Sequence, residues 1–549
     1  MIKKILNGQT KSITLASFIL GVAYLGSAVL GLLRDRLLAS HFGAGDELDV
    51  YYAAFGIPDF VALLLIMGAV SAVVIPVFSE YFARSKEEAW KFLSALLNLF
   101  LISLISVSII LVIFAPYLIS LIAPGFSEEK KALAVELTRI MFLSPILLGI
   151  SNIISGVLQI FHRFFVTALA PLMYNFGIIC GILFFVPVIG IQGLAWGVVF
   201  GGFLHFLIQL PALISSGFQY KKISFLSHPG IPKTLTLMIP RSLGLAAGQI
   251  NILVIIRLAS AVSGSIAVFN LANNLTSLLI GLIGISFSTA VFPTLSLAFS
   301  REARGDFTRN FSLAFRQIIF LIIPLGCLFF ILRAQIVRIV LGAGKFGWID
   351  TRLTAACLGI FSFGLFAQAL ILLVSKTFYA THNTRIPALI SFATVILNAC
   401  LSLLFVWLLS FQNIFHHFFE SFLKLQGIEK IAIVGLALAF SLSGIFQFIL
   451  LLFSLYKKLG DLNFRTIWLS FQKIAVATVF MAIFAYFMLR LLASVPFINT
   501  DTVIGLLLQG GFASLFSLLA YIIVSFSLRS PELLMFLSSL KRRFGNTMH

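Results

Sequence analysis

Long apolar runs recur along the whole sequence and restrict what this chain can fold into. A helix needs roughly 17–25 predominantly apolar residues to cross a bilayer, and only helices and closed barrels satisfy every backbone polar group within lipid. About fourteen such runs predict an all-α polytopic membrane protein with about 14 transmembrane helices. They lie near residues 13–33, 50–78, 92–114, 132–160, 165–187, 193–215, 234–259, 266–296, 312–340, 353–379, 386–409, 431–456, 470–494 and 504–527.

The composition agrees with a chain that faces lipid. Hydrophobic residues make up 60% and charged residues 10% of the sequence, and the mean hydropathy is +1.09. Soluble domains have about 45–50% apolar and about 25% charged residues. The first run follows "MIKK" and could pass for a signal peptide. Its apolar stretch exceeds the usual ~7–15 residues, however, and more runs follow, so we interpret it as a true span.

The net charge of +19 would suggest a nucleic-acid partner in a soluble chain. In a membrane protein the positive-inside rule explains it better, since Lys and Arg are retained on the cytoplasmic side. With a cytoplasmic N-terminus, about 24 of the 38 Lys and Arg fall in inside segments. This bias predicts cytoplasmic termini, an even number of spans, residues 34–49 on the outer side and no nucleic-acid partner.

The sequence also repeats itself. "GAVSAVVIPVFSEYFARSKEEAWKF" resembles "GISFSTAVFPTLSLAFSREARGDFTRNF", which aligns Pro76 with Pro293, and a later match aligns Asn175 with Asn398. Parallel repeats of this kind are typical of transporters, with the substrate site between the repeats. We therefore expect an N-terminal six-helix lobe at 1–220, a C-terminal six-helix lobe at 221–460, and two additional transmembrane helices with a basic cytoplasmic tail at 461–549.

No motif for catalysis, metal binding or nucleotide binding stands out. His416 and His417 are adjacent in a predicted outer loop, where ordinary loop polarity explains them better than a metal site. "FGAG" lacks the Gly-Lys-Ser/Thr of a phosphate-binding loop and is typical of a turn. We expect no enzymatic activity, no cofactor and no metal, and transport driven by an ion gradient or the membrane potential.

Polar residues within or beside the spans are the candidate site residues. A charge at the bilayer centre costs roughly 2.5–3.5 kcal/mol on insertion scales, so it usually faces a cavity or a partner. Arg34 and Asp35 follow the first run, where reaching the outer surface is the alternative to a cavity role. Asp59 follows a proline in the second span, and Arg257 ends the seventh. Five side-chain amides have two possible roles, structural hydrogen bonding and lining of a cavity, and the sequence leaves both open. They are Gln249, Asn251, Asn270, Asn273 and Asn274.

A family resemblance adds to this interpretation. "LGLLRDRLLASHFGAGDELDVYYAAFGIPDF", followed by "GAVSAVVIPVFSEY", resembles the first two spans of the MurJ/MviN family. These are lipid II flippases of the multidrug/oligosaccharidyl-lipid/polysaccharide exporter superfamily. "GSIAVFNLANNL" resembles the eighth span of that family. The resemblance covers nearly the whole chain and implies two six-span lobes followed by two C-terminal helices.

By position, the resemblance implies a cavity arginine at Arg34, a neighbouring acid at Asp35 and a further functional acid at Asp49. A diphosphate-bearing lipid requires cations, and the guanidinium fork of arginine suits phosphate oxygens.

The chain also departs from the family pattern. At three positions where the family often has cavity arginines, this chain has Ala28, Ala62 and Asn274. Where the family often has an acid in the second span, it has Met67. Either the diphosphate is therefore bound differently, with Arg36 and Arg257 contributing, or the substrate has changed. Asn274 stays a candidate substrate-binding residue.

The resemblance implies a flippase that moves the undecaprenyl-diphosphate-linked peptidoglycan precursor lipid II from the inner to the outer leaflet of the bacterial cytoplasmic (inner) membrane. Alternating access, coupled to ions or to the membrane potential, would carry the head group across. Two alternatives are an exporter of another polyprenyl-linked oligosaccharide and a non-transporting cell-wall assembly scaffold. Expected partners are lipid II, membrane lipids, a monovalent cation or proton, and cell-wall synthesis proteins.

Overall fold

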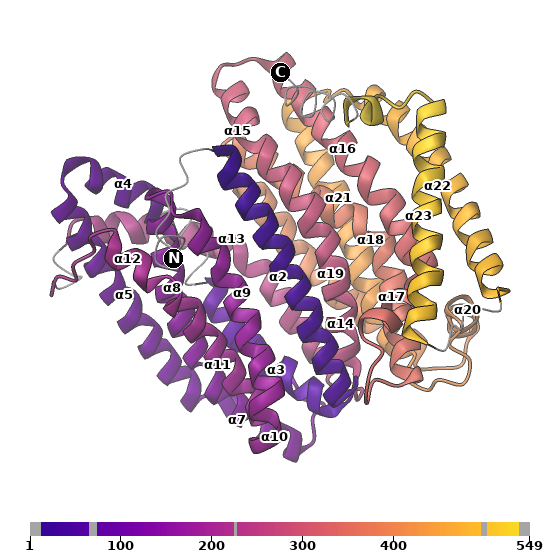
Figure 1. Cartoon of the computed structure of the whole chain (residues 1–549), viewed down its shortest axis with the longest axis horizontal. Coiled ribbons are helices and arrows are strands. Elements are labelled where there is room, and N and C mark those ends of the chain that lie inside the picture. Colours follow the sequence, from indigo (N-terminus) through magenta and orange to yellow (C-terminus); the bar gives the residue numbers. More distant parts are fainter. Residues whose placement is uncertain (1–12, 65–73, 224–227, 496–501, 537–549) are drawn as a thin grey trace. The chain divides into compact units, whose positions relative to one another are not determined.

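The computed structural model describes residues 13–64, 74–223, 228–495 and 502–536, which contain helices and no β-strand. Eleven helical segments of this part are long and apolar enough to cross a membrane, which confirms the predicted all-α membrane fold. The other three predicted spans, near 13–33, 50–78 and 234–259, overlap with further helices of Figure 1 in the residues that the structure describes. The total of 14 stays a prediction.

Two compact units make up the chain, Met1–Ala267 and Val268–His549. The sequence repeat instead predicts a lobe boundary near residue 220. The predicted lobes rest on sequence similarity, which the packing of these units does not test, and they stay a prediction.

The N-terminal unit contains twelve described α-helices. Their bounds are α2 Ile13–Phe42, α3 Asp46–Ala62, α4 Ile75–Arg84, α5 Lys86–Ile113, α6 Ala115–Ile122, α7 Glu128–Met141, α8 Leu143–Ile160, α9 Phe164–Cys180, α10 Val186–Ile189, α11 Gln192–Leu207, α12 Leu210–Ser215 and α13 Gly230–Ala259. Three pairs of them, α7 with α8, α9 with α10 and α11 with α12, each form one candidate span.

A tight turn joins α2 to α3, as the sequence predicts. Gly43 has φ +64°, a left-handed conformation that glycine adopts without strain. The first turn of α3 carries three acidic side chains, Asp46, Glu47 and Asp49, which the positive end of the helix dipole favours. Helix α2 continues well past residue 33, so Arg34 lies inside a helix rather than at its end.

Glycines allow α9 and α11 to cross at very short range. A Cβ atom at Gly177 would lie 2.3 Å from the Gly201 Cα, and one at Gly181 would lie 2.4 Å from the Gly197 Cα. Small residues permit such close packing in membrane helices, where dispersion rather than the hydrophobic effect holds helices together. A π-helical turn, Gly181–Phe185, follows α9 at this crossing. The crossing fixes α9, the helix that faces the candidate site.

The C-terminal unit begins within α14 and contains ten α-helices in its described part. Their bounds are α14 Ser265–Leu279, α15 Ser286–Ser300, α16 Arg304–Ile331, α17 Arg333–Val340, α18 Trp348–Ala380, α19 Arg385–Leu409, α20 Ile414–Leu423, α21 Ala432–Leu459, α22 Phe464–Ala493 and α23 Val503–Ser527. A π-helical segment, Ile280–Ile285, connects α14 to α15.

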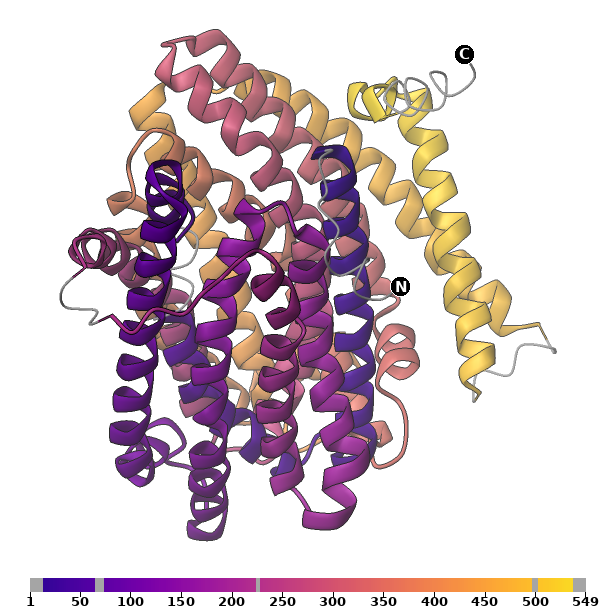
Figure 2. The ribbon, with the colours of Figure 1, turned by 60° about the vertical axis from the view of Figure 1, so that its left-hand side comes forward.

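The last two helices, α22 and α23, lie side by side (Figure 2), and α22 packs on α16. The Tyr521 hydroxyl of α23 donates to the Phe320 carbonyl of α16 at 2.8 Å. Next to α23, the buried carboxylate of Glu532 accepts from Arg316 Nη1 at 2.8 Å and from Ser470 Oγ at 2.7 Å. Removing one partner of a buried ion pair costs about 3–5 kcal/mol, so this pair holds the last two helices on the unit.

The predicted outer loop around His416 and His417 is in fact partly helical, since both residues lie on α20. Asn413 caps this helix by accepting from the His416 amide at 2.8 Å. His416 Nδ1 lies 2.8 Å from the Leu409 carbonyl, and His417 Nδ1 lies 3.3 Å from Glu420 Oε2. An N-cap and local partners therefore make a short helix within the segment that the sequence predicts as an outer loop.

Candidate functional site

Arg34 and Asp35 form an ion pair on α2, the helix that packs against α9. Arg34 Nε and Nη2 donate to the same oxygen of Asp35, Oδ1, at 3.0 and 2.8 Å. The Arg34 side chain is 23% exposed and the Asp35 side chain only 5%. Arg34 therefore reaches open space while its counter-charge is covered.

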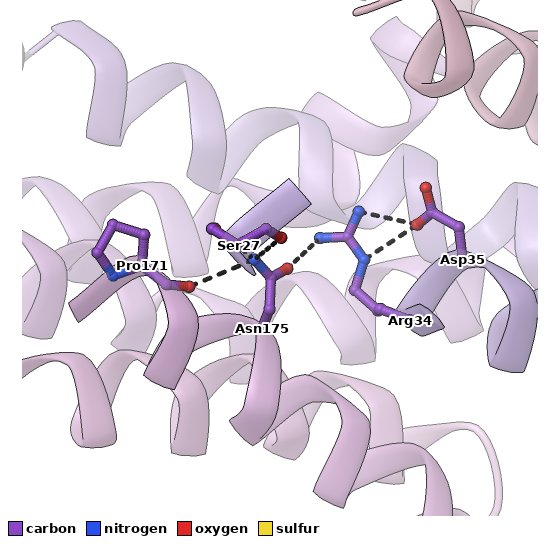
Figure 3. Close-up of polar contacts among 5 residues, drawn as sticks. All are labelled: Ser27, Arg34, Asp35, Pro171 and Asn175. Atoms are coloured by element: carbon purple, nitrogen blue, oxygen red, sulfur yellow. Dashed lines mark hydrogen bonds and ion pairs between the residues drawn. The ribbon is translucent and has the colours of Figure 1, made fainter. Parts of the chain in front are cut away.

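Asn175 of α9 holds the guanidinium on its other side, as Figure 3 shows. Its Oδ1 accepts from Arg34 Nη1 at 3.1 Å. Its Nδ2 donates to Ser27 Oγ at 3.2 Å and to the Pro171 carbonyl at 3.3 Å. These contacts assign the amide orientation, since only the oxygen can accept from arginine. Asn175 thus fixes Arg34 against α9.

Arg34 retains hydrogen-bonding capacity in this arrangement. A guanidinium has five N–H donors, and Asp35 and Asn175 take three of them. One donor on each Nη atom has no partner among the residues that the structure describes. Two adjacent donors of this kind match two oxygens of a phosphate group.

Tyrosines of α3 lie beside the pair. Tyr51 and Tyr52 are close enough to Arg34 to interact with its charge. The Tyr51 and Tyr52 ring centroids are 5.3 Å apart. Tyr51 is 4% exposed, and the Tyr52 hydroxyl is buried without a hydrogen-bond partner in the described part of the chain. The tyrosines exclude water from one flank of the pair and so strengthen its electrostatic interactions.

A second polar contact joins α3 to α13. The Gln249 side-chain amide donates to Asp59 Oδ2 at 2.7 Å. Sequence reasoning singled out both residues as polar groups within spans without pairing them. Their contact satisfies a carboxylate in a helix interior, as a membrane-embedded acid requires.

Asp49 has a structural environment that differs from that of Arg34. It is 1% exposed and accepts from the backbone amides of Gly264 at 2.6 Å and Ala267 at 2.7 Å. These amides belong to the start of α14, where helix N–H groups lack intrahelical partners. Asp49 therefore caps α14 from α3. Its neighbour Asp46 pairs with Lys130 at 2.7 Å.

The other predicted site residues are spread over the chain. Arg36 is half-buried on α2. Arg257 is exposed at the end of α13 and donates to the Leu121 carbonyl. Asn274 belongs to the C-terminal unit. Ala28 and Ala62 are half-buried, and Met67 lies outside the described residues. The structure thus brings together Arg34 and Asp35, and gives Asp49 and Arg257 separate partners.

A histidine outside the spans has a shifted pKa. His228 Nδ1 accepts from the Gly230 amide at 3.1 Å, and its ring lies 5.0 Å from the Tyr81 ring and 5.5 Å from the Phe92 ring. Burial between these rings lowers the pKa of His228, and the charge of Glu88 partly opposes this shift. The neutral imidazole thus caps the first turn of α13.

Comparison with known proteins gives the family. The family model described as "Lipid II flippase MurJ" matches residues 38–504. The chain belongs to the MurJ family. A MurJ relative from Buchnera aphidicola subsp. Schizaphis graminum, named "Probable lipid II flippase MurJ", is 30% identical over 482 residues, which cover 86% of this chain and 89% of the relative. The "Lipid II flippase MurJ" of Burkholderia cenocepacia is 28% identical, over 69% of this chain and 76% of its own.

Solved structures agree with the family. The structure titled "Lipid II flippase MurJ, inward closed conformation" matches with a TM-score of 0.74 at 27% identity, over 93% of this chain and 99% of that one. An inward-facing multidrug resistance MATE family transporter of the MOP superfamily matches with a TM-score of 0.62 at 17% identity, over 81% and 99%. The second likeness concerns the fold alone. MurJ membership and the apolar helices make this a membrane protein of the inner membrane.

The structure also shows which site residues sequence reasoning missed. Asn175 entered the sequence argument only as an anchor of the repeat, and Ser27, Tyr51 and Tyr52 did not enter it. The described residues contain no group of three or more His, Cys, Asp or Glu side chains that could hold a metal ion. The site that the geometry offers is one arginine, its counter-charge and a neutral amide that orients it.

Proposed function

We propose that this protein flips lipid II from the inner to the outer leaflet of the cytoplasmic membrane. One observation carries the proposal: Arg34 keeps two N–H donors for an anion while Asp35 and Asn175 hold its guanidinium in place. The printed names of the MurJ relatives support lipid II as the substrate. A diphosphate is the part of lipid II that needs such a cation.

The geometry favours a binding step in which the substrate phosphate partly replaces Asp35 as the partner of Arg34. In the absence of substrate, Asp35 neutralises Arg34 and so lowers the cost of a charge in the membrane. An incoming phosphate takes the two remaining donors and competes with Asp35 for the guanidinium. Asn175 is neutral, so it orients Arg34 without competing electrostatically. Because the counter-charge stays adjacent, the bound anion is held weakly enough to be released on the other side.

The finer features of the function are proposals as well. The 1–220 and 221–460 lobes would alternate access to the two leaflets, driven by a monovalent cation, a proton or the membrane potential. Both termini would lie in the cytoplasm, as the distribution of Lys and Arg favours. Asp49 would act by holding the start of α14, and Arg36, Arg257 and Asn274 would add contacts to the substrate. Cell-wall synthesis proteins are the expected protein partners.

The experiment is rescue of a bacterium depleted of its own lipid II flippase. The wild-type chain should restore growth, and Arg34→Ala should not, at equal membrane levels. Arg309→Ala is the matched control, because Arg309 is 72% exposed and pairs with Asp306 on its own helix. Full rescue by Arg34→Ala would remove Arg34 from the mechanism, whereas no rescue by the wild-type chain would favour a scaffold or another lipid substrate.

A further inference from the structure

A basic cavity of about 590 Å³ lies within the C-terminal unit, apart from Arg34 and its partners. The ends of α16 and α22, the starts of α17 and α18, and the end of α20 surround it. Arg333, Arg352, Lys424 and Arg490 line the cavity, and none of its other lining residues that the structure describes is Asp or Glu. Four like charges around one cavity repel each other unless an anion neutralises them.

The three arginines among these cations donate to neutral groups. Arg333 Nη1 donates to the Phe330 carbonyl at 2.9 Å, and Arg490 Nη2 donates to the Tyr486 hydroxyl at 2.7 Å. Arg352 Nε donates to the Lys424 carbonyl at 3.1 Å. None of the four forms an ion pair with a carboxylate in the described part of the chain. Arginines that are oriented by neutral acceptors keep their full charge for a ligand.

Aromatic rings orient two of these cations. The Arg333 guanidinium lies 4.8 Å from the centroid of the Phe330 ring, and that of Arg490 lies 5.2 Å from the Tyr486 ring. The Arg333 stem also packs on Gly359, where a Cβ atom would approach its Cδ to 2.9 Å. Stacking on a ring fixes a guanidinium while leaving N–H donors available. Arg333 and Arg490 are therefore held in position before a ligand binds.

The surroundings of the cavity indicate a ligand that arrives from the membrane. Trp348, Phe422 and Tyr486 line it and are 58%, 43% and 56% exposed. Helices α16, α18 and α22, all candidate membrane spans, end or begin here. Exposed Trp and Tyr at span ends are typical of the level of lipid head groups. A ligand with a phosphate for the cations and acyl chains for the rings fits both parts of this lining.

We propose that this cavity binds the phosphate head group of an anionic membrane lipid. Arg333 and Arg490 contact the phosphate oxygens, Arg352 and Lys424 add charge, and the exposed rings contact the first part of the acyl chains. The bound lipid neutralises the four cations and links α22 to the end of α16 and the start of α17. This binding does not depend on which lipid the protein transports.

Lipid binding to the purified full-length chain tests the proposal. Native mass spectrometry would count phosphatidylglycerol molecules bound during a titration, with phosphatidylcholine as the lipid without net charge. The variant Arg333→Gln/Arg490→Gln should weaken saturable phosphatidylglycerol binding about tenfold or more, because two charge-assisted contacts are lost. Arg333→Lys/Arg490→Lys keeps the charge but not the stacked guanidinium, so its binding should lie between those of the wild type and the double Gln variant.

The matched control is Arg304→Gln/Arg309→Gln, which removes the same charge from exposed positions at the other end of α16. It should leave phosphatidylglycerol binding unchanged. If the double Gln variant melts at a much lower temperature, Arg490→Gln alone serves, since Arg490 is exposed and its hydrogen bond goes to Tyr486 on the same helix. Unchanged binding in the cavity variants, or an equal loss in the control, would overturn the proposal. Inorganic phosphate that binds as tightly as the lipid would overturn the assignment of a lipid.

Discussion

The substitution Asp35→Asn separates the two roles of the Arg34–Asp35 pair. In the structure, Asp35 Oδ1 accepts two hydrogen bonds from Arg34, at 3.0 and 2.8 Å. A hydrogen bond to a charged group contributes about 1.5–3 kcal/mol, compared with about 1 kcal/mol for a neutral pair. An amide in place of the carboxylate should therefore lower the stability of the substrate-free protein by about 2 kcal/mol.

The same substitution should strengthen substrate binding. Two like charges about 6 Å apart at an effective dielectric constant of about 20 repel by about 3 kcal/mol, so removing the Asp35 charge should tighten binding of a diphosphate by up to about 100-fold. Tighter binding in one leaflet slows release in the other, and lipid II transport should fall. Asp35→Asn should therefore bind better and transport less.

Thermal melting of the detergent-purified protein measures both effects. Without ligand, Asp35→Asn should melt at a lower temperature than the wild type, and added lipid II should raise its melting temperature more. Asp46→Asn is the control, because Asp46 is 46% exposed and its pair with Lys130 is worth at most about 1 kcal/mol. If Asp35→Asn binds lipid II no more tightly than the wild type, the carboxylate does not compete with the substrate, and the reasoning fails.

Two further substitutions and one pH titration probe structural contacts outside the Arg34 site. Asp49→Ala should lower the free energy of unfolding by about 2–4 kcal/mol, measured from melting, because the buried amides of Gly264 and Ala267 lose their acceptor. Gly197→Ala should cost about 1–3 kcal/mol in the same assay, since the new Cβ would lie 2.8 Å from the Gly181 Cα. His228 should make stability depend on pH: its folded-state pKa is lowered, so its contribution is present above the unfolded pKa of about 6.5 and is lost as the pH falls through that value towards the folded one.

Each of these predictions has a control. Asp49→Asn keeps a carbonyl acceptor and should lose less stability than Asp49→Ala; equal losses would mean that capping is not the role of Asp49. Gly248→Ala places its Cβ in open space and should be neutral, so a cost equal to that of Gly197→Ala would refute close helix crossing as the cause. His228→Asn keeps an acceptor that does not titrate, and a pH dependence that survives this change would exclude His228 as its origin.

The sequence predicts the helical membrane fold, because apolar runs of sufficient length specify spans. For Arg34 the local sequence leaves a cavity role and reaching the outer surface both open, and only the family resemblance implies the cavity. The partners of Arg34 are harder to predict. Asn175 lies 141 residues away and becomes a ligand of Arg34 only when α2 packs on α9, and nothing local distinguishes it from a helix-packing asparagine.

Asp49 shows a different limit of the sequence. An acid beside a Gly-Ala-Gly turn is equally consistent with a binding residue and with a cap. The structure places two backbone amides against its carboxylate, from a segment more than 200 residues away. Long-range backbone contacts of this kind leave no pattern in a single sequence. The cavity at Arg333 and Arg490 also leaves no pattern in the sequence, because its lining comes from five separate helices.

Reconstituted flipping tests the central claim most directly. The purified chain would be inserted into vesicles that contain fluorescently labelled lipid II, and the fraction of label moved between leaflets would be measured with an imposed ion gradient or membrane potential. The account predicts that the wild-type protein moves the label, that Arg34→Ala does not, and that Arg309→Ala behaves as the wild type. Equal flipping by Arg34→Ala, or no flipping of lipid II by the wild-type protein, would contradict it.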